Sequence, residues 1–500
     1  MFRTLLVAAM AAVACVVPGV AQAAPGGPEW GACPADVVAP GLECTTLEVP
    51  LDYRKPDGRQ IEVAVSRRKS TNPAARRGIL LTNPGGPGGP GLDLPGQLKL
   101  LGWPQSVLET YDVIGFDPRG VGHSTPVTCG LMPAQLRSNV PPYALGPADV
   151  TAQAEYAKGV ARQCGASRTA SMLPYITTAN TARDMDRIRA ALGEPKLSYY
   201  GVSYGTYLGA VYTTLFPWRS DRIVLDSNLA PGGLDVTGSR LLAQGFDDRF
   251  PDFAAFAVAH PEYDLGATPA AVRAKYFDLA RRLDARPNSQ GVDGKLFRQI
   301  TFGMFYYNAT LPYLASAWHA LDTGAPIGPP PGGSVPDLEN LLSSQLYVVC
   351  GDVNWPESVR TYQQNVAVDR FRHPMFGPAA ANIWPCAFWP SEPAEPQVRI
   401  GDRGPSDVLM VQNLRDPATP LKGALSLRRA FGDRARLVTA DQGGHGAYVF
   451  GANGCANNTT TAFLVTGVRP ARDLACAAEP ADQAPAAAAV AAEVLPVRLF

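Results

Sequence analysis

The 500-residue sequence has no excess of charge of either sign. Lys and Arg together number 44, as do Asp and Glu. Proteins that bind nucleic acids neutralise phosphates with clustered basic side chains, so this balance does not indicate a nucleic-acid partner. The composition likewise indicates no particular oligomeric state.

The sequence also has no hydrophobic run that could cross a bilayer, which requires ~20 apolar residues. The apolar run 5–17 is too short for this, but it follows Arg3 and precedes Ala-Gln-Ala at 21–23. A basic start, a short apolar run and an A-x-A site are typical of a secretory signal peptide. We therefore expect removal of residues 1–23 and a secreted protein. A lipid-anchored form through Cys15 is the less favoured alternative, because the usual leucine of a lipoprotein site is missing.

Clustered metal ligands are missing as well. The nine cysteines include no C-x-x-C pair and have no histidine nearby, so we expect no zinc site and no other cofactor. Removal of the signal peptide leaves an even set of eight cysteines, which in an exported protein predicts disulfides. The sequence alone does not select among the many possible pairings, but short loops are the easiest to close. The favoured pairs are Cys33–Cys44, Cys129–Cys164, Cys350–Cys386 and Cys455–Cys476.

Short apolar strands alternate with helical segments through most of the chain. Residues 61–66 alternate apolar and polar side chains, which is typical of a half-buried strand, whereas later runs are continuously apolar. In 178–192 the apolar residues recur at helical spacing, with charges on the other face. This alternation predicts an α/β fold with a mostly parallel, doubly wound sheet. The expected strands are 61–66, 78–82, 111–116, 197–200, 223–225, 408–411 and 436–438.

The segment 231–400 interrupts this rhythm. It contains helical stretches such as 268–284 and 338–346, Pro-rich breaks and no βαβ unit. It also follows a strand of the sheet, and α/β sheets place their sites at the carboxyl ends of the strands. We therefore interpret it as an inserted, mostly helical cap that roofs the site. The predicted organisation is a signal peptide at 1–23, an α/β core at 24–230 and 401–476, the cap at 231–400, and an Ala/Pro-rich disordered tail at 477–500.

The pattern Gly201-Val202-Ser203-Tyr204-Gly205 follows the expected strand 197–200 and precedes an apolar helical stretch. In α/β hydrolases, Gly-x-Ser-x-Gly between a strand and a helix forms the nucleophile elbow, a strained turn that exposes the serine hydroxyl. The two glycines let the turn pass close to its neighbours. An ordinary glycine-rich turn would share the five letters but not this setting. We therefore expect the α/β-hydrolase fold, with Ser203 as nucleophile.

A serine nucleophile requires a base and an acid, which in this fold follow it in the order acid, then histidine. His445 lies beyond the last expected strand, in a glycine-rich loop, and is the expected base. Asp416 follows strand 408–411 and is the expected acid, whose carboxylate fixes the imidazole tautomer and stabilises its positive charge. Asp226, at the end of the preceding strand, is the alternative.

The tetrahedral intermediate requires backbone N–H donors. One is expected from Tyr204, directly after the nucleophile, and the other from the loop after strand 78–82, which reads Asn-Pro-Gly-Gly-Pro-Gly-Gly-Pro-Gly. No Gly-Lys-Ser/Thr follows this loop, which excludes a phosphate-binding P-loop. Gly86 is the expected donor, with Gly85 and Gly88 as alternatives.

Together, several motifs resemble the secreted tripeptidyl aminopeptidases of actinobacteria, which are α/β hydrolases related to prolyl aminopeptidase. The resemblance runs from about Cys33 to Cys476. It implies that Ser203, Asp416 and His445 form a catalytic triad, and that a helical cap closes over cleavage near a free peptide N-terminus. The matching motifs are Val49-Pro50-Leu51-Asp52-Tyr53, the loop 83–91, Asp117-Pro118-Arg119-Gly120-Val121-Gly122, GVSYGTYLG from Gly201, and Asp416-Pro417 with Thr419-Pro420.

Cleavage near a free N-terminus requires binding of the substrate ammonium, for which cap carboxylates are the physical means. Cys350-Gly351-Asp352 resembles a family pattern near the cap, so Asp352 and Glu357 are the favoured substrate-binding residues. Glu339 and Glu262 are alternatives.

Three functions follow from these residues. The favoured one is a secreted serine exopeptidase that releases short peptides, by resemblance tripeptides, from free N-termini. The second is a secreted carboxylesterase or amidase with the same triad, because the family includes such enzymes with altered caps. The third, a non-catalytic binding protein, is disfavoured by the intact triad and oxyanion loop. A peptide or another small molecule is thus the expected partner.

Overall fold

The computed structural model describes residues 27–39, 41–136, 138–331 and 337–479. The signal peptide expected at 1–23 and most of the tail expected at 477–500 lie outside the described residues. No described helix is long and apolar enough to cross a bilayer. The central element is a nine-stranded sheet of order β1-β2-β4-β3-β5-β6-β7-β8-β9. Its strands are β1 Glu43–Pro50, β2 Gln60–Arg68, β3 Gly78–Asn83, β4 Tyr111–Phe116, β5 Leu197–Val202, β6 Ser220–Asp226, β7 Val408–Arg415, β8 Ala435–Gly443 and β9 Leu474–Cys476.

The sheet is antiparallel only at one edge. β1 pairs with β2, and β2 with β4, in antiparallel fashion, whereas all later neighbours are parallel. β2 to β8 each contain one of the seven strands expected from the sequence. β1 and β9 were not expected. They are edge strands, and β9 has only 3 residues, too few to display a periodic pattern.

Helices cover both faces of the sheet, as the continuous apolar runs require. In β7, Val408 and Met410 face one buried layer, whereas Leu409 and Val411 face the other. The first layer includes residues of α4, α5 and α13, and the second includes residues of α1, α2 and α14. These core helices are α1 Leu94–Leu100, α2 Gln105–Thr110, α4 Thr178–Ala191, α5 Tyr204–Leu215, α13 Leu421–Phe431 and α14 Gly454–Thr466. The molecule therefore has the doubly wound α/β architecture expected from its sequence.

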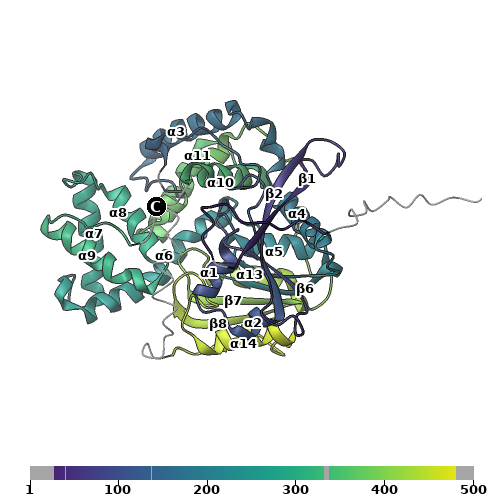
Figure 1. Cartoon of the computed structure of the whole chain (residues 1–500). Helices are drawn as coiled ribbons and strands as arrows, with labels where there is room; N and C mark the ends of the chain where they lie inside the picture. Colours follow the sequence, from purple (N-terminus) through teal and green to yellow (C-terminus); the bar gives the residue numbers. More distant parts are fainter. Residues whose placement is uncertain (1–26, 40, 137, 332–336, 480–500) are drawn as a thin grey trace, which may run out of the picture.

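Between β6 and its neighbour β7 the chain forms helices but no strand of the sheet in its described part. Figure 1 shows α7, α8 and α9 on the side of the molecule away from β1. They pack with α6 and α12 around a separate core rich in aromatic rings, among them Phe246, Phe250, Tyr276, Phe302 and Trp318. We call the helices over the site the cap. Those between β6 and β7 are α6 Val236–Ala259, α7 Pro269–Ala285, α8 Gly294–Met304, α9 Leu311–Thr323, α10 Leu338–Asp352, α11 Val359–Arg372 and α12 Gly377–Ala380.

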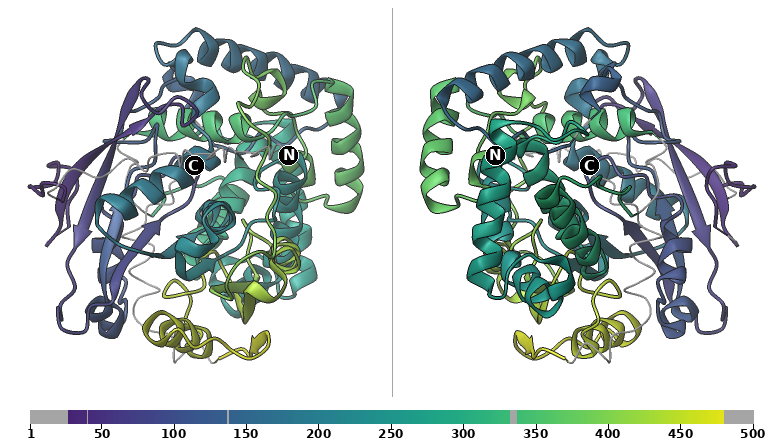
Figure 2. Two further views of the ribbon diagram at one scale, coloured as in Figure 1. Left: turned by 90° about the vertical axis from the view of Figure 1, so that its right-hand side faces the viewer. Right: turned by 90° about the vertical axis from the view of Figure 1, so that its left-hand side faces the viewer.

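The cap also receives a segment from before β5. Helix α3 (Pro147–Ala166) packs against α11, and both lie together in the views of Figure 2. Val150 and Ala154 of α3 share a buried cluster with Tyr362 of α11. The core range 24–230 expected from the sequence includes this segment, because a helical pattern does not indicate which layer a helix joins. The cap is thus built from two separate stretches of the chain.

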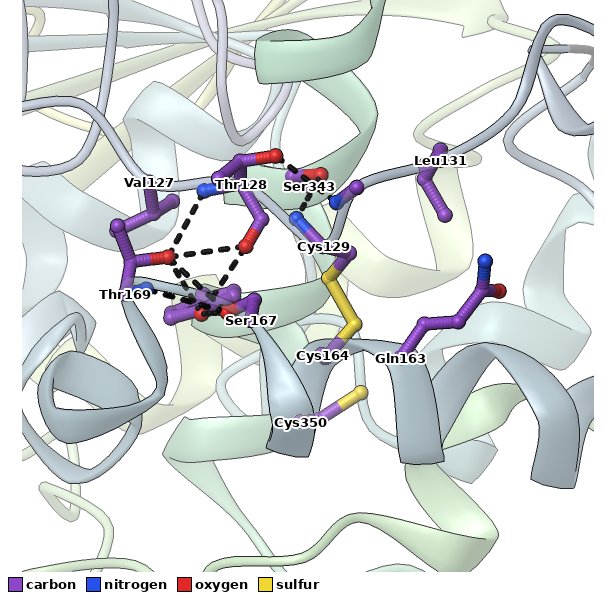
Figure 3. Close-up of a disulfide and its surroundings, with 12 residues drawn as sticks. Val127, Thr128, Cys129, Leu131, Gln163, Cys164, Ser167, Thr169, Ser343 and Cys350 are labelled. Atoms are coloured by element: carbon purple, nitrogen blue, oxygen red, sulfur yellow. Dashed lines mark hydrogen bonds between the residues drawn. A yellow bond between two sulfur atoms is a disulfide. The ribbon is translucent and has the colours of Figure 1, made fainter.

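Four disulfides join the cysteine pairs that sequence proximity favoured: Cys33–Cys44, Cys129–Cys164, Cys350–Cys386 and Cys455–Cys476. Figure 3 shows the second of them, which links the loop after β4 to α3. Beside it, the amide of Cys129 donates to Ser343 Oγ on α10 (2.9 Å), and Thr128 Oγ1 donates to Glu339 Oε1 (2.9 Å). This disulfide and these bonds attach the loop after β4 to both α3 and α10.

Candidate active site

Ser203 occupies a sharp turn between β5 and α5. Its backbone has φ 59° and ψ −124°, a conformation that is strained for a residue with a side chain. Its neighbours leave no room for larger residues: a Cβ on Gly201 would lie 2.5 Å from the carbonyl oxygen of Gly205, and one on Gly205 would lie 2.9 Å from that of Asn83. Local sterics therefore explain both glycines of the pattern, and the turn has the geometry of a nucleophile elbow.

His445 lies in the loop after β8, and Asp416 directly follows β7. The ring Nδ1 of His445 lies 3.0 Å from both carboxylate oxygens of Asp416. The carboxylate is fully buried and accepts hydrogen bonds from the amides of Ala418 (2.9 Å) and Thr419 (2.8 Å) and from Thr419 Oγ1 (2.9 Å). An ionised Asp416 requires the proton on Nδ1, which leaves Nε2 free to accept a proton.

Asp226, the alternative acid, holds the His445 loop instead. Its carboxylate accepts from the amides of Ala447 (2.7 Å) and Tyr448 (2.9 Å) and from the hydroxyl of Tyr200 (2.9 Å). Burial raises the pKa of Asp226 to about 6. The carboxylate therefore fixes the backbone beyond the imidazole, while Asp416 contacts the ring itself.

A cap residue that the sequence did not indicate also holds His445. The carbonyl oxygen of Tyr306, just after α8, accepts from the backbone amide of His445 (2.7 Å), and the two rings lie 5.0 Å apart between centroids. This contact joins segments distant in the chain, so no local motif could have revealed it.

The glycine-rich loop after β3 lies against Ser203. A Cβ on Gly85 would be 2.9 Å from Cβ of Ser203 and 3.2 Å from the amide nitrogen of Tyr204. The amide of Gly85 donates to Asn83 Oδ1 (3.0 Å), whereas those of Gly86 and Tyr204 have no acceptor among the described residues. Gly88 packs on α10 instead, where a Cβ would meet the carbonyl of Leu341 at 2.5 Å. Of the three glycines considered, Gly86 thus combines an amide without an acceptor among the described residues with a place in the lining of the cavity that contains Ser203.

Ser203, His445, Gly86 and Tyr204 line one cavity of about 150 Å³ beneath the cap, which we call the reaction cavity. Most of its other side chains are apolar, and no Asp, Glu, Lys or Arg is among its described lining residues. Its apolar walls include Val140, Val202, Leu229, Leu234, Leu242, Phe302, Leu341, Trp384 and Phe450. Elsewhere, no group of three or more His, Cys, Asp or Glu side chains in the described part of the chain could hold a metal ion.

The structure does not bring the expected amine-binding acids into the reaction cavity. Asp352 ends α10 and accepts from the amide (2.7 Å) and the hydroxyl (2.6 Å) of Thr178, at the start of α4. Thr178 Oγ1 in turn accepts from the hydroxyl of Tyr204 (2.6 Å), so Asp352 lies behind the elbow. Glu357 is exposed in the loop between α10 and α11. Of the alternatives, Glu339 binds the loop after β4, and Glu262 is exposed beside His260.

Burial raises the pKa of Asp352 to about 6, an effect that its bonds to Thr178 oppose and that Glu395 reinforces. A largely buried carboxylate with these partners is positioned to orient Tyr204 and the start of α4. It does not face the space in which Ser203 would react.

The chain is similar to known proteins over nearly its whole length. Residues 373–476 match a family model described as TAP-like protein. The chain is 38% identical over 480 residues to a tripeptidyl aminopeptidase of Streptomyces lividans, covering 91% of this chain and 88% of the relative. It is 30% identical over 516 residues to serine protease Hip1 of Mycobacterium tuberculosis, covering 95% and 98%. It is also 31% identical over 501 residues to carboxylesterase B of that organism, covering 92% and 93%. The chain therefore belongs to the tripeptidyl aminopeptidase family of α/β-fold serine hydrolases.

Proposed function

We propose that this protein is a secreted serine exopeptidase that releases short peptides, most readily tripeptides, from free N-termini. Ser203 is its nucleophile, His445 its general base, and Asp416 the acid that orients the base. The amides of Gly86 and Tyr204 form its oxyanion hole. The observation that carries the proposal is the strained Ser203 turn, which shares a cavity with an imidazole held by a buried carboxylate.

In this mechanism Nε2 of His445 takes the proton of Ser203 Oγ as Oγ attacks the carbonyl carbon of the scissile bond. The oxyanion that forms accepts hydrogen bonds from the amides of Gly86 and Tyr204. Collapse breaks the C–N bond, and the leaving amine takes the proton back from His445. Water then attacks the acyl-enzyme with the same base, which releases the peptide and restores Ser203.

The relatives and the cap support a peptide as substrate. Two relatives of nearly full overlap are a tripeptidyl aminopeptidase and a serine protease. Cap residues such as Leu242, Phe302 and Trp384 line the reaction cavity beside Ser203, which favours chain ends over the interior of folded proteins. Secretion is supported by the four disulfides, because these persist in oxidising compartments.

The test is to incubate the purified protein with peptides that differ only in N-terminal acetylation and to identify the products by mass. We expect free peptides to lose an N-terminal tripeptide, and acetylated ones to react at least about tenfold more slowly, since acetylation removes the ammonium charge by which an aminopeptidase recognises a chain end. Equal cleavage of both, or cleavage inside folded proteins, would contradict the exopeptidase function.

The second candidate is a carboxylesterase, favoured by the apolar lining of the reaction cavity, which has no carboxylate among its described residues. The similar carboxylesterase B of Mycobacterium tuberculosis supports it as well. A panel of 4-nitrophenyl esters beside peptide 4-nitroanilides separates the two. Efficient turnover of long-chain esters with no peptide cleavage would favour the esterase.

A further inference from the structure

A second, larger cavity of about 760 Å³ adjoins the reaction cavity under the cap, and we call it the cap cavity. The two share four lining residues: Asn139, Val140, Gln345 and Trp384. Ligand sites commonly have volumes of roughly 300–1,000 Å³. The reaction cavity alone is therefore too small for a tripeptide, whereas the cap cavity is large enough.

Gln345 stands at the junction of these cavities with an unused primary amide. The residue is only 3% exposed, yet its side chain has no hydrogen-bond partner among the described residues. Its amide atoms are also not among the unpaired polar atoms that are sealed from solvent. They therefore reach the cavity space. A buried amide without a partner costs free energy, so a site that keeps one has a use for it.

Helix α10 holds Gln345 firmly beside the oxyanion loop. Gly88 lies two residues after Gly86 in this loop. A Cβ on Gly88 would lie 3.2 Å from the backbone nitrogen of Gln345. One turn earlier, Asn340 donates to the carbonyls of Gly120 and Val127 (2.9 Å each). The side chain of Gln345 thus projects from an anchored helix, as a recognition residue requires.

We propose that Gln345 binds the peptide backbone of the substrate, whose N-terminal part runs from the reaction cavity into the cap cavity. Its amide donates one hydrogen bond to a peptide carbonyl and accepts one from a peptide N–H, a pairing that a primary amide can make. The N-terminal peptide that an exopeptidase releases has a limited length. It is therefore the part of the substrate that fits a cavity of the size of the cap cavity. This inference rests on the proposed function. It names the binding site of the N-terminal peptide of the substrate, which forms the acyl group on Ser203.

The experiment compares three substrates: a tripeptide 4-nitroanilide with a free N-terminus, alanine 4-nitroanilide, and 4-nitrophenyl acetate. Gln345→Met keeps the length of the side chain and its helix propensity but removes both hydrogen-bonding groups. We expect it to lower kcat/KM for the tripeptide about tenfold, as the loss of one or two hydrogen bonds predicts. The small acetate, which fits the reaction cavity, should react within about twofold of the wild-type rate. The loss for alanine 4-nitroanilide should lie between the losses for the tripeptide and the acetate.

Gln364→Met is the matched control, because Gln364 is exposed on α11 and lines neither cavity. It should leave all three substrates unaffected. If thermal unfolding shows that Gln345→Met is not folded, Gln345→Asn replaces it, since it keeps a neutral amide but shortens its reach by one methylene and so weakens the same hydrogen bonds.

Two outcomes overturn the inference alone: unchanged tripeptide cleavage in the variant, or an equal loss for the tripeptide and the acetate. The latter would mean that Gln345 supports the fold. If the wild-type protein hydrolyses the acetate but no free peptide, the proposed function fails, and this inference fails with it.

Discussion

The sheet and the cap hold the site in different ways. The sheet presents Ser203, Asp416 and the His445 loop at the ends of neighbouring strands, whose positions are fixed by continuous backbone pairing and by two buried layers. The cap has its own aromatic core. It also reaches the site through single contacts, such as Tyr306 to His445 and Asp352 to Thr178. In the proposed mechanism the chemistry therefore depends on the sheet, while the cap selects and positions what reacts.

Removing the nucleophile from the sheet should have the largest effect. We expect Ser203→Ala to lower turnover of every substrate by roughly 10⁴–10⁶-fold, because only the oxyanion hole and binding remain. Covalent labelling with a fluorophosphonate, followed by intact mass, checks this. A variant that still labels one to one would reject Ser203.

Asp416→Asn should come next, with a loss of about 10⁴-fold in kcat, because an amide at this position favours the wrong imidazole tautomer. Asp226→Asn is the matched control at the end of the adjacent strand. It should lower the free energy of unfolding, since Asp226 holds two backbone amides of the His445 loop. A larger kinetic loss for Asp226→Asn than for Asp416→Asn would exchange their assigned roles.

The disulfides allow the two regions to be weakened separately. Replacing Cys129 and Cys164 by serine frees the loop that joins the core to α3, whereas the same change at Cys455 and Cys476 affects only the core near β9. Each should cost about 2–4 kcal/mol in the free energy of unfolding, measured with guanidinium. Only the first should also reduce tripeptide cleavage more than acetate hydrolysis. Equal kinetic effects would contradict a selective role for the cap.

The same division explains what could be predicted from the sequence. The elbow glycines, the acid after β7 and the histidine after β8 follow from short-range chemistry, and their order along the chain indicated the fold. The positions of Tyr306, Asp352 and Gln345 relative to the site depend on how the cap packs on the sheet, which no local pattern encodes. Asp352 was therefore expected to bind an amine on family resemblance, yet it contacts Thr178 behind the elbow.

The smallest predicted effect tests this contact between cap and sheet through its pH dependence. The folded protein raises the pKa of Asp352 to about 6, so it binds this proton more tightly than the unfolded chain, whose carboxyl has the model value of 3.8. The contribution of Asp352 to stability is therefore greatest below pH about 4 and falls as the pH rises to about 6, by up to about 3 kcal/mol. Asp226 contributes a pH dependence of the same sign, because its pKa is also raised. Asp352→Asn cannot titrate at position 352. The difference in the free energy of unfolding between the wild type and this variant, measured at each pH, therefore gives the contribution of Asp352 alone.

The groups that face Asp352 are Tyr204 and Tyr207 of α5 and Glu395 before β7, and neither tyrosine titrates in this range because burial raises its pKa. If Asp352 orients the Tyr204 amide, the Asn variant should also lose kcat about threefold at unchanged KM, as expected for one weakened hydrogen bond. A stability difference that does not vary with pH, or a change in KM alone, would instead assign Asp352 to substrate binding or to packing.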